Sequence, residues 1–116
     1  MIVVVGGHAS GKRTYIKGLG YVAQDMADGV LDERPVLLNL QDLVAKDSRE
    51  PHELASALSG KKVVSCCEIG NGIVPIDPDE ITWRERVGRT LNLLSADAER
   101  VVRMVCGIPV VLKDDG

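Results

Sequence analysis

The stretch Ile2-Val3-Val4-Val5-Gly6-Gly7-His8-Ala9-Ser10-Gly11-Lys12 decides the fold. Its apolar first half predicts a buried strand, and the GxxxxGK pattern that follows is typical of the loop that binds phosphates in nucleotide-binding proteins. The glycines let the backbone curl so that N–H groups point at an anion. An ordinary glycine-rich turn is the alternative interpretation. We predict that the phosphates of ATP or GTP contact Gly6, Gly7, His8, Ala9, Ser10, Gly11, Lys12 and Arg13.

The residue after the loop lysine departs from the usual pattern. Lys12 is suited to bridge the β- and γ-phosphates, and a Ser or Thr hydroxyl normally follows it and holds Mg²⁺, but here Arg13 follows. A carboxylate normally ends a second buried strand and holds the same ion through water, but here that place is taken by Asn39. Thr14 is rotated about 100° along the helix, so we expect its hydroxyl to point elsewhere. Either the long Arg13 side chain swings away from the ion, or Arg13 itself contacts phosphate, which would make a metal-poor anion site. We assign no metal ligand.

Length and charge narrow the function. The chain has 116 residues and a net charge of -3, so we expect one phosphate-loop domain spanning residues 1–116. Its basic residues form no stripe, which argues against nucleic acid as a partner. No run is long enough to cross a membrane, and the apolar start has no basic leader. We expect a cytoplasmic protein without membrane contact.

The three cysteines do not form a recognisable metal-binding pattern. Cys66, Cys67 and Cys106 show neither CxxC nor Cys/His ligand spacing, and each ends an apolar run. We predict reduced, small apolar strand residues; a redox role is the alternative.

Apolar runs of strand length alternate with longer helical patterns, which indicates βαβ units around a largely parallel sheet. Asp77, Pro78 and Glu80 form a strong helix start, with Ile81, Val87, Leu91 and Leu94 on one apolar face. We predict an α/β, three-layer fold like that of P-loop NTPases, with a mostly parallel sheet and a C-terminal β-hairpin. The expected strands are 2–5, 36–40, 62–67, 101–105 and 110–113; the expected helices are 12–29, 41–46, 51–59 and one from 78, with a loop over 68–75.

Glu68 is the main catalytic candidate besides Lys12. It follows a predicted strand at the edge where ligands gather in open α/β sheets, so it is placed to orient a substrate hydroxyl or to hold the metal. An exposed loop carboxylate is the alternative. Asp42 could replace the missing charge, but solvation at a helix start explains it more simply, and His52 is expected at the surface.

Three blocks of the sequence resemble one family. The loop Gly6 to Lys12, the run Glu68-Ile69-Gly70-Asn71-Gly72-Ile73-Val74-Pro75 and the segment Val105 to Pro109 are similar to blocks of the adenosylcobinamide kinase/adenosylcobinamide-phosphate guanylyltransferase family. Trp83-Arg84-Glu85 and Gly88-Arg89 resemble two further family segments. The resemblance implies a homo-oligomeric enzyme of cobalamin biosynthesis. It would phosphorylate adenosylcobinamide with a nucleoside triphosphate and then attach GMP through a guanylylated histidine.

The segment that carries the family's histidine lies between the first helix and the second strand. Here Lys12 and Asn39 are only 27 positions apart with no histidine between them, so we expect guanylyl transfer to be absent. Three interpretations stay open: a shortened cobinamide kinase that uses Lys12 and Glu68, a degenerate relative that binds nucleotide or another anion without turnover, and an interaction protein whose loop is structural.

Overall fold

A six-stranded sheet forms the centre of the computed structural model, which describes residues 1–68 and 77–115. The strand order is β2-β3-β4-β1-β5-β6, and every neighbouring pair is parallel except the last. The strands are β1 (Ile2–Gly6), β2 (Met26–Asp28), β3 (Val36–Leu38), β4 (Val63–Cys67), β5 (Arg100–Val105) and β6 (Ile108–Asp114).

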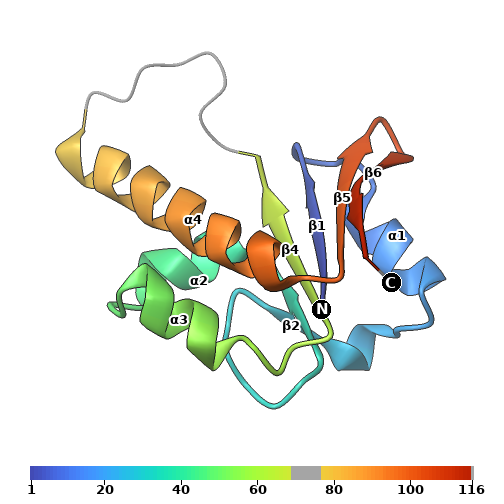
Figure 1. The fold of residues 1–116 in the computed structure, drawn as a ribbon, viewed down its shortest axis with the longest axis horizontal. Coiled ribbons are helices and arrows are strands. Elements are labelled where there is room, and N and C mark those ends of the chain that lie inside the picture. Colours follow the sequence, from blue (N-terminus) through green and yellow to red (C-terminus); the bar gives the residue numbers. More distant parts are fainter. Residues whose placement is uncertain (69–76, 116) are drawn as a thin grey trace.

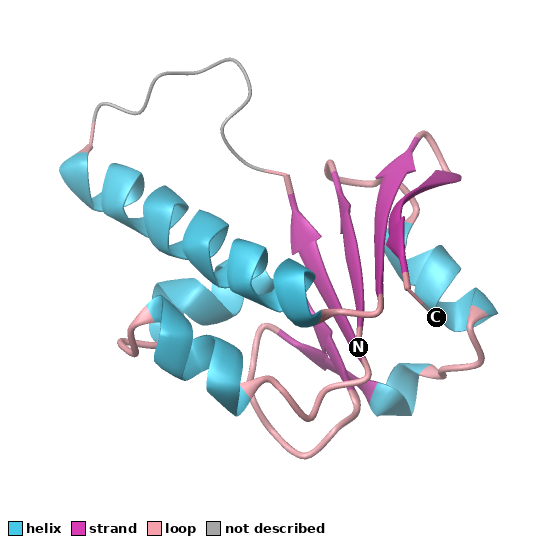
Figure 2. Ribbon diagram, in the orientation of Figure 1, coloured by secondary structure: helices cyan, strands magenta, loops and turns pink. Residues whose placement is uncertain are grey.

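Helices cover both faces of this sheet (Figures 1 and 2). The helices are α1 (Lys12–Gly18), the 3₁₀ turn η1 (Ala23–Asp25), α2 (Leu40–Lys46), α3 (Pro51–Ala57) and α4 (Pro78–Asp97). α1 lies on the face to the right of the sheet in Figure 1, and α2, α3 and α4 lie on the opposite face. This arrangement confirms the predicted α/β fold with a mostly parallel sheet and a C-terminal hairpin.

Alternation along β1 divides the core into two layers. Val3 packs with the residues of α2, α3 and α4, whereas Val4 packs with Ile16 of α1, and all three side chains are fully buried. Both faces of β1 are therefore apolar, as expected for a parallel strand with helices on both sides. Because strand and helix are both fixed by packing, the loop between them is held at the carboxyl edge of the sheet.

The predicted first helix is too long. α1 ends at Gly18, and Gly20 has a φ of +108°, a conformation that favours glycine and interrupts a helix. The chain then forms η1 and the unpredicted strand β2, which pairs in parallel with β3 from Met26 to Asp28. The helical periodicity of residues 19–26 was outweighed by the two glycines and by pairing with a strand further along the chain.

The predicted strand over 36–40 is also shorter. β3 ends at Leu38, because Asn39 takes a left-handed conformation with a φ of 59° and Leu40 begins α2. The predicted start of α4 is confirmed, since the Asp77 side chain accepts a hydrogen bond from the Asp79 N–H at 2.9 Å. Ile81 is an exception on its apolar face: it is 42% exposed, whereas Val87 and Leu94 are buried.

The C-terminal hairpin turns over two residues rather than the expected four. Cys106 and Gly107 have φ values of 50° and 79°, the positive pair that a tight hairpin turn requires. Cys106 is therefore an exposed turn residue and not a strand residue. β6 lies at the sheet edge and exposes apolar side chains. Of the loop expected over 68–75, residues 69–75 lie outside the described residues.

Candidate phosphate-binding site

The loop between β1 and α1 needs its glycines at two points. A Cβ on Gly6 would lie 2.4 Å from Ser10 Oγ and 2.9 Å from the Met104 carbonyl oxygen. Gly11 has a φ of +96°, which side chains rarely allow, and a Cβ there would lie 3.2 Å from the Cα of Gly107. The glycines of the GxxxxGK pattern are thus dictated by the close approach of the backbone to neighbouring elements.

The turn between β5 and β6 supports the loop from the side. The Gly107 N–H donates to the Ser10 carbonyl oxygen at 3.0 Å, and within the loop the Ser10 N–H donates to Gly7. Among the described residues, the N–H groups of Gly11, Lys12 and Arg13 have no backbone acceptor, and the buried Ser10 Oγ has no hydrogen-bond partner. The loop consequently holds polar hydrogens that an anion can satisfy.

Lys12 reaches back over the loop. Its Nζ donates to the carbonyl oxygens of Gly6 and Gly7 at 3.1 and 2.7 Å. The Gly6 carbonyl also accepts from the Glu68 N–H at 2.9 Å. The two predicted catalytic residues are therefore joined through one backbone oxygen at the carboxyl end of β1.

A pocket of about 340 Å³ opens beside the loop. Lys12 and Arg13 place cations there, and no carboxylate lines it among the residues that the structure describes. Thr14, one position after Arg13 on α1, also borders the pocket. The lining residues are His8, Ala9, Ser10, Gly11, Lys12, Arg13, Thr14, Asn39 and Cys67.

These lining residues do not fit a resident magnesium ion. Mg²⁺ prefers carboxylates and water, but the polar groups here are an amide, two hydroxyls, an imidazole and two cations. Within residues 1–68 and 77–115, no group of three His, Cys, Asp or Glu side chains is placed to hold a metal. The charges that line the pocket favour a negative ligand over a cation.

Glu68 lies at the same sheet edge but does not line this pocket. It is paired with Arg103 of β5, whose Nε and Nη2 donate to Oε1 and Oε2 at 2.5 and 3.2 Å, and this pairing raises the pKa of Arg103. Glu68 lies two positions after Cys66, and Arg103 lies two positions after Val101. Cys66 and Val101 face the α4 side of the sheet, and because side chains alternate along a strand, Glu68 and Arg103 lie on that side too. The fork-like contact fixes the Glu68 carboxylate on the α4 side of β1.

Arg103 had no place in the sequence-based site. Its only signal was a single charge inside the apolar run of β5, at a position that alternation turns toward α4. Asp42 lies in the first turn of α2 but does not border the pocket. It thus brings no charge to the pocket wall.

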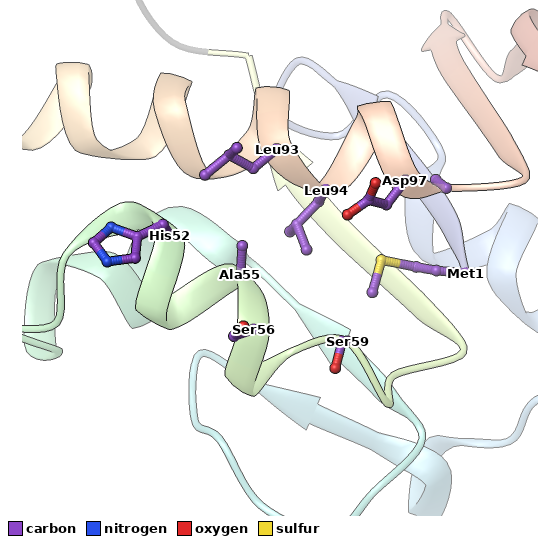
Figure 3. A pocket seen from close by; sticks show the side chains of 9 residues that line it. Met1, His52, Ala55, Ser56, Ser59, Leu93, Leu94 and Asp97 are labelled. Carbon is purple, nitrogen blue, oxygen red and sulfur yellow. The ribbon is translucent and has the colours of Figure 1, made fainter.

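A second hollow of about 280 Å³ lies between α3 and α4 (Figure 3). His52 of α3 and Leu93 and Asp97 of α4 line it, and Met1 closes one end. His52 is exposed, as the sequence predicted. Because Met1 precedes β1, this hollow lies toward the opposite end of the sheet from the phosphate loop and shares no lining residue with the pocket there.

The three cysteines differ in their surroundings. All are unpaired thiols; Cys66 is buried, Cys67 is half-buried at the pocket wall and Cys106 is exposed. Burial raises the pKa of the Cys66 thiol to about 12. Cys66 is thus a protonated core residue at neutral pH.

One family model matches most of the chain. It describes cobinamide kinase / cobinamide phosphate guanyltransferase and covers residues 21–112. The matched segment begins after residues 6–13, so the family match does not cover the loop predicted to bind phosphate. Among curated proteins, none matches the chain. No helix in the described part of the chain has the length and apolar character to cross a membrane. On the extent of the family match, the chain belongs to the cobinamide kinase / cobinamide phosphate guanyltransferase family.

Proposed function

We propose that this chain binds the phosphates of ATP or GTP in the pocket beside residues 6–13 and transfers the terminal phosphoryl group to the hydroxyl of a cobinamide. The single observation that carries nucleotide binding is the cradle itself. Lys12, Arg13, the loop N–H groups without a backbone acceptor and Ser10 Oγ lie at one hollow, and no carboxylate from residues 1–68 or 77–115 lines it. Family membership supports a role in cobalamin biosynthesis and supplies the substrate class.

The transfer step divides between the two sides of β1. The substrate hydroxyl oxygen would form a bond to the γ-phosphorus while the bond from that phosphorus to the β–γ bridging oxygen breaks. Lys12 would move from the Gly6 and Gly7 carbonyls to the phosphates and balance the charge of the leaving diphosphate. Glu68 is the candidate acceptor of the hydroxyl proton, and the Arg103 contact would orient it.

Binding without turnover is the second candidate, and one observation favours it. The pocket lacks both usual magnesium ligands, since Arg13 and Asn39 stand at those positions and both line the pocket. Phosphoryl transfer normally depends on the metal for charge neutralisation. An anion sensor or a partner subunit would need the cradle but not the metal.

Calorimetric titration with ATP and with GTP, each with Mg²⁺ and with a chelator, tests the proposal. We expect saturable binding that changes little when Mg²⁺ is removed. Absence of binding under all four conditions would contradict it. Robust Mg²⁺-dependent phosphorylation of cobinamide would exclude the second candidate, whereas binding with background turnover would exclude the first.

We also propose that guanylyl transfer is absent. That step requires a nucleophilic histidine near the phosphates; His8 borders the pocket within the loop, and His52 lies on α3 away from it. Incubation with labelled GTP and mass analysis of the intact chain decides the question. A covalent GMP adduct on either histidine would overturn the proposal.

We further propose that the chain forms homo-oligomers. Sedimentation velocity measures this, and a monomer at all concentrations would contradict the proposal.

A further inference from the structure

Asn39 at the pocket wall is held by contacts from three neighbouring elements. Its N–H donates to Ser65 Oγ of β4 at 3.1 Å, and its Nδ2 donates to Asp28 Oδ1 at the end of β2 at 2.6 Å. Its Oδ1 accepts from Gln41 Nε2 of α2 at 3.2 Å. Asn39 has a left-handed backbone, with a φ of 59° and a ψ of 60°, and these main-chain and side-chain hydrogen bonds hold it there.

These contacts determine which way the amide points. A flipped amide would set its oxygen against the Asp28 carboxylate and its NH₂ against the Gln41 NH₂, so both contacts would be lost. Gln41 is itself fixed, because its Oε1 accepts from the Cys67 N–H at 3.1 Å and its side chain is nearly buried. Asp28, Asn39, Gln41 and Cys67 form one hydrogen-bonded chain, and its members Asn39 and Cys67 both line the pocket.

Asp28 also decides which side chain can occupy position 39. A carboxylate there would face the carboxylate of Asp28 at hydrogen-bond distance, so the hydrogen bond would be lost and the two negative charges would repel each other. The amide is the side chain of the same shape that can donate to Asp28. The negative charge is consequently on Asp28, which does not line the pocket, and not on residue 39, which does. Among the described residues, no carboxylate lines the pocket.

We propose that Asp28 is a positioning residue that keeps position 39 at the wall of the phosphate pocket free of negative charge and thereby makes the pocket select polyphosphate free of divalent metal. The inference rests on the proposed nucleotide binding and specifies the form of its ligand. Asp28 acts through Asn39 and does not touch the phosphates.

An exchange of the two side chains provides the sharpest test. The single variant Asn39→Asp creates the carboxylate pair, whereas the double variant Asp28→Asn with Asn39→Asp restores one donor and one acceptor and moves the charge to the pocket wall. Asn92→Asp on the exposed part of α4 is the matched control, because it makes the same chemical change far from the loop. Each protein is titrated with ATP and with inorganic triphosphate, in chelator and in Mg²⁺, and its thermal midpoint is measured.

We expect Asn39→Asp to lower the midpoint and to weaken metal-free binding at least tenfold, and the exchange to recover the midpoint of the unaltered protein. The exchanged protein should bind ATP at least tenfold more tightly with Mg²⁺ than with chelator, a preference that the unaltered protein and the control should lack. A structural role alone would restore stability without creating this metal preference. Equal midpoints of Asn39→Asp and the unaltered protein, or an exchanged protein indifferent to Mg²⁺, would overturn the inference. If the unaltered protein binds neither ATP nor triphosphate, the proposed function fails, and the inference that deepens it fails with it. A difference in thermal midpoint between Asn39→Asp and the unaltered protein would still establish the Asp28–Asn39 contact.

Discussion

Two loops at different places in this molecule are each held by a lysine that donates to two backbone carbonyls. In the phosphate loop, Lys12 Nζ contacts Gly6 and Gly7. In the loop between β2 and β3, Lys61 Nζ contacts the carbonyl oxygens of Asp32 and Arg34. The contacts are chemically alike, but we infer opposite purposes from their surroundings.

The difference lies in burial and in additional support. Lys61 is only 8% exposed and comes from a separate segment just before β4. Its loop is further held by Arg34, which donates to the Asp32 carboxylate and to the Met26 carbonyl oxygen. Lys12 belongs to the loop that it contacts and borders an open pocket. Lys61 also borders a hollow, of about 320 Å³, but its side chain is almost wholly buried. The half-buried Lys12 therefore suits binding, whereas the buried Lys61 suits a role in stabilising the fold.

Lys12→Met should produce the largest effect, and that effect should be on binding. Loss of charged hydrogen bonds, each worth about 1.5–3 kcal/mol, should weaken ATP binding by about 3 kcal/mol or more if Lys12 reaches two phosphate oxygens. The free energy of unfolding should change by less than about 1 kcal/mol, because the site is open to water. Calorimetry and urea denaturation of the same preparation measure both quantities. Unchanged affinity would refute the assigned role of Lys12.

Lys61→Met should give the reverse pattern. Two half-buried carbonyls lose their charged donor at a cost of about 1–3 kcal/mol each, so the free energy of unfolding should fall by about 2–5 kcal/mol. Nucleotide affinity, measured where the variant is fully folded, should stay within about threefold of that of the unaltered protein. The comparison between the two loops breaks down if affinity falls in parallel with stability.

Arg13→Ser sharpens the comparison at the pocket. If Arg13 contacts phosphate, metal-free binding should weaken by about 1.5–3 kcal/mol, the value of one charged hydrogen bond. Lys17→Ser, at the last turn of α1 and outside the pocket lining, is the matched control. Equal losses in the two variants would indicate a general effect of net charge instead of a contact.

A fall in pH should weaken the contacts that hold the loop between β2 and β3, but not those of the phosphate loop. The hydrogen bonds and the charge of Arg34 hold the pKa of Asp32 below its usual value. This pair contributes stability above the unfolded pKa of about 3.9, and that contribution is lost as the pH falls through the lower folded pKa. Asp32→Asn should therefore flatten the fall in the free energy of unfolding below about pH 4, as urea titrations at successive pH values would record. This effect on the free energy of unfolding should be the smallest of the four, because the Asp32–Arg34 pair is open to solvent. If Asp32→Asn leaves the pH dependence unchanged, the prediction for Asp32 is wrong.

Local patterns predicted the parts of the fold that depend on neighbours in sequence. The apolar run of β1, the glycines of the loop and the Asp77 helix start each need only a few adjacent residues, and each was placed correctly. The first helix was misjudged at Gly18, and β2 was missed. A three-residue strand has little periodicity of its own and depends on pairing with β3.

The sequence by itself determined the GxxxxGK pattern after β1, the parallel α/β plan and the two departures at Arg13 and Asn39, since residue identity alone carries that information. Only the tertiary structure decided that Arg103 pairs with Glu68, that Lys61 contacts the loop after β2, and that Asp28 accepts a hydrogen bond from Asn39. Each of these contacts joins residues far apart in the chain that neighbouring strands or loops bring together. The order of strands in the sheet, which no local pattern encodes, therefore sets the electrostatics of the candidate site.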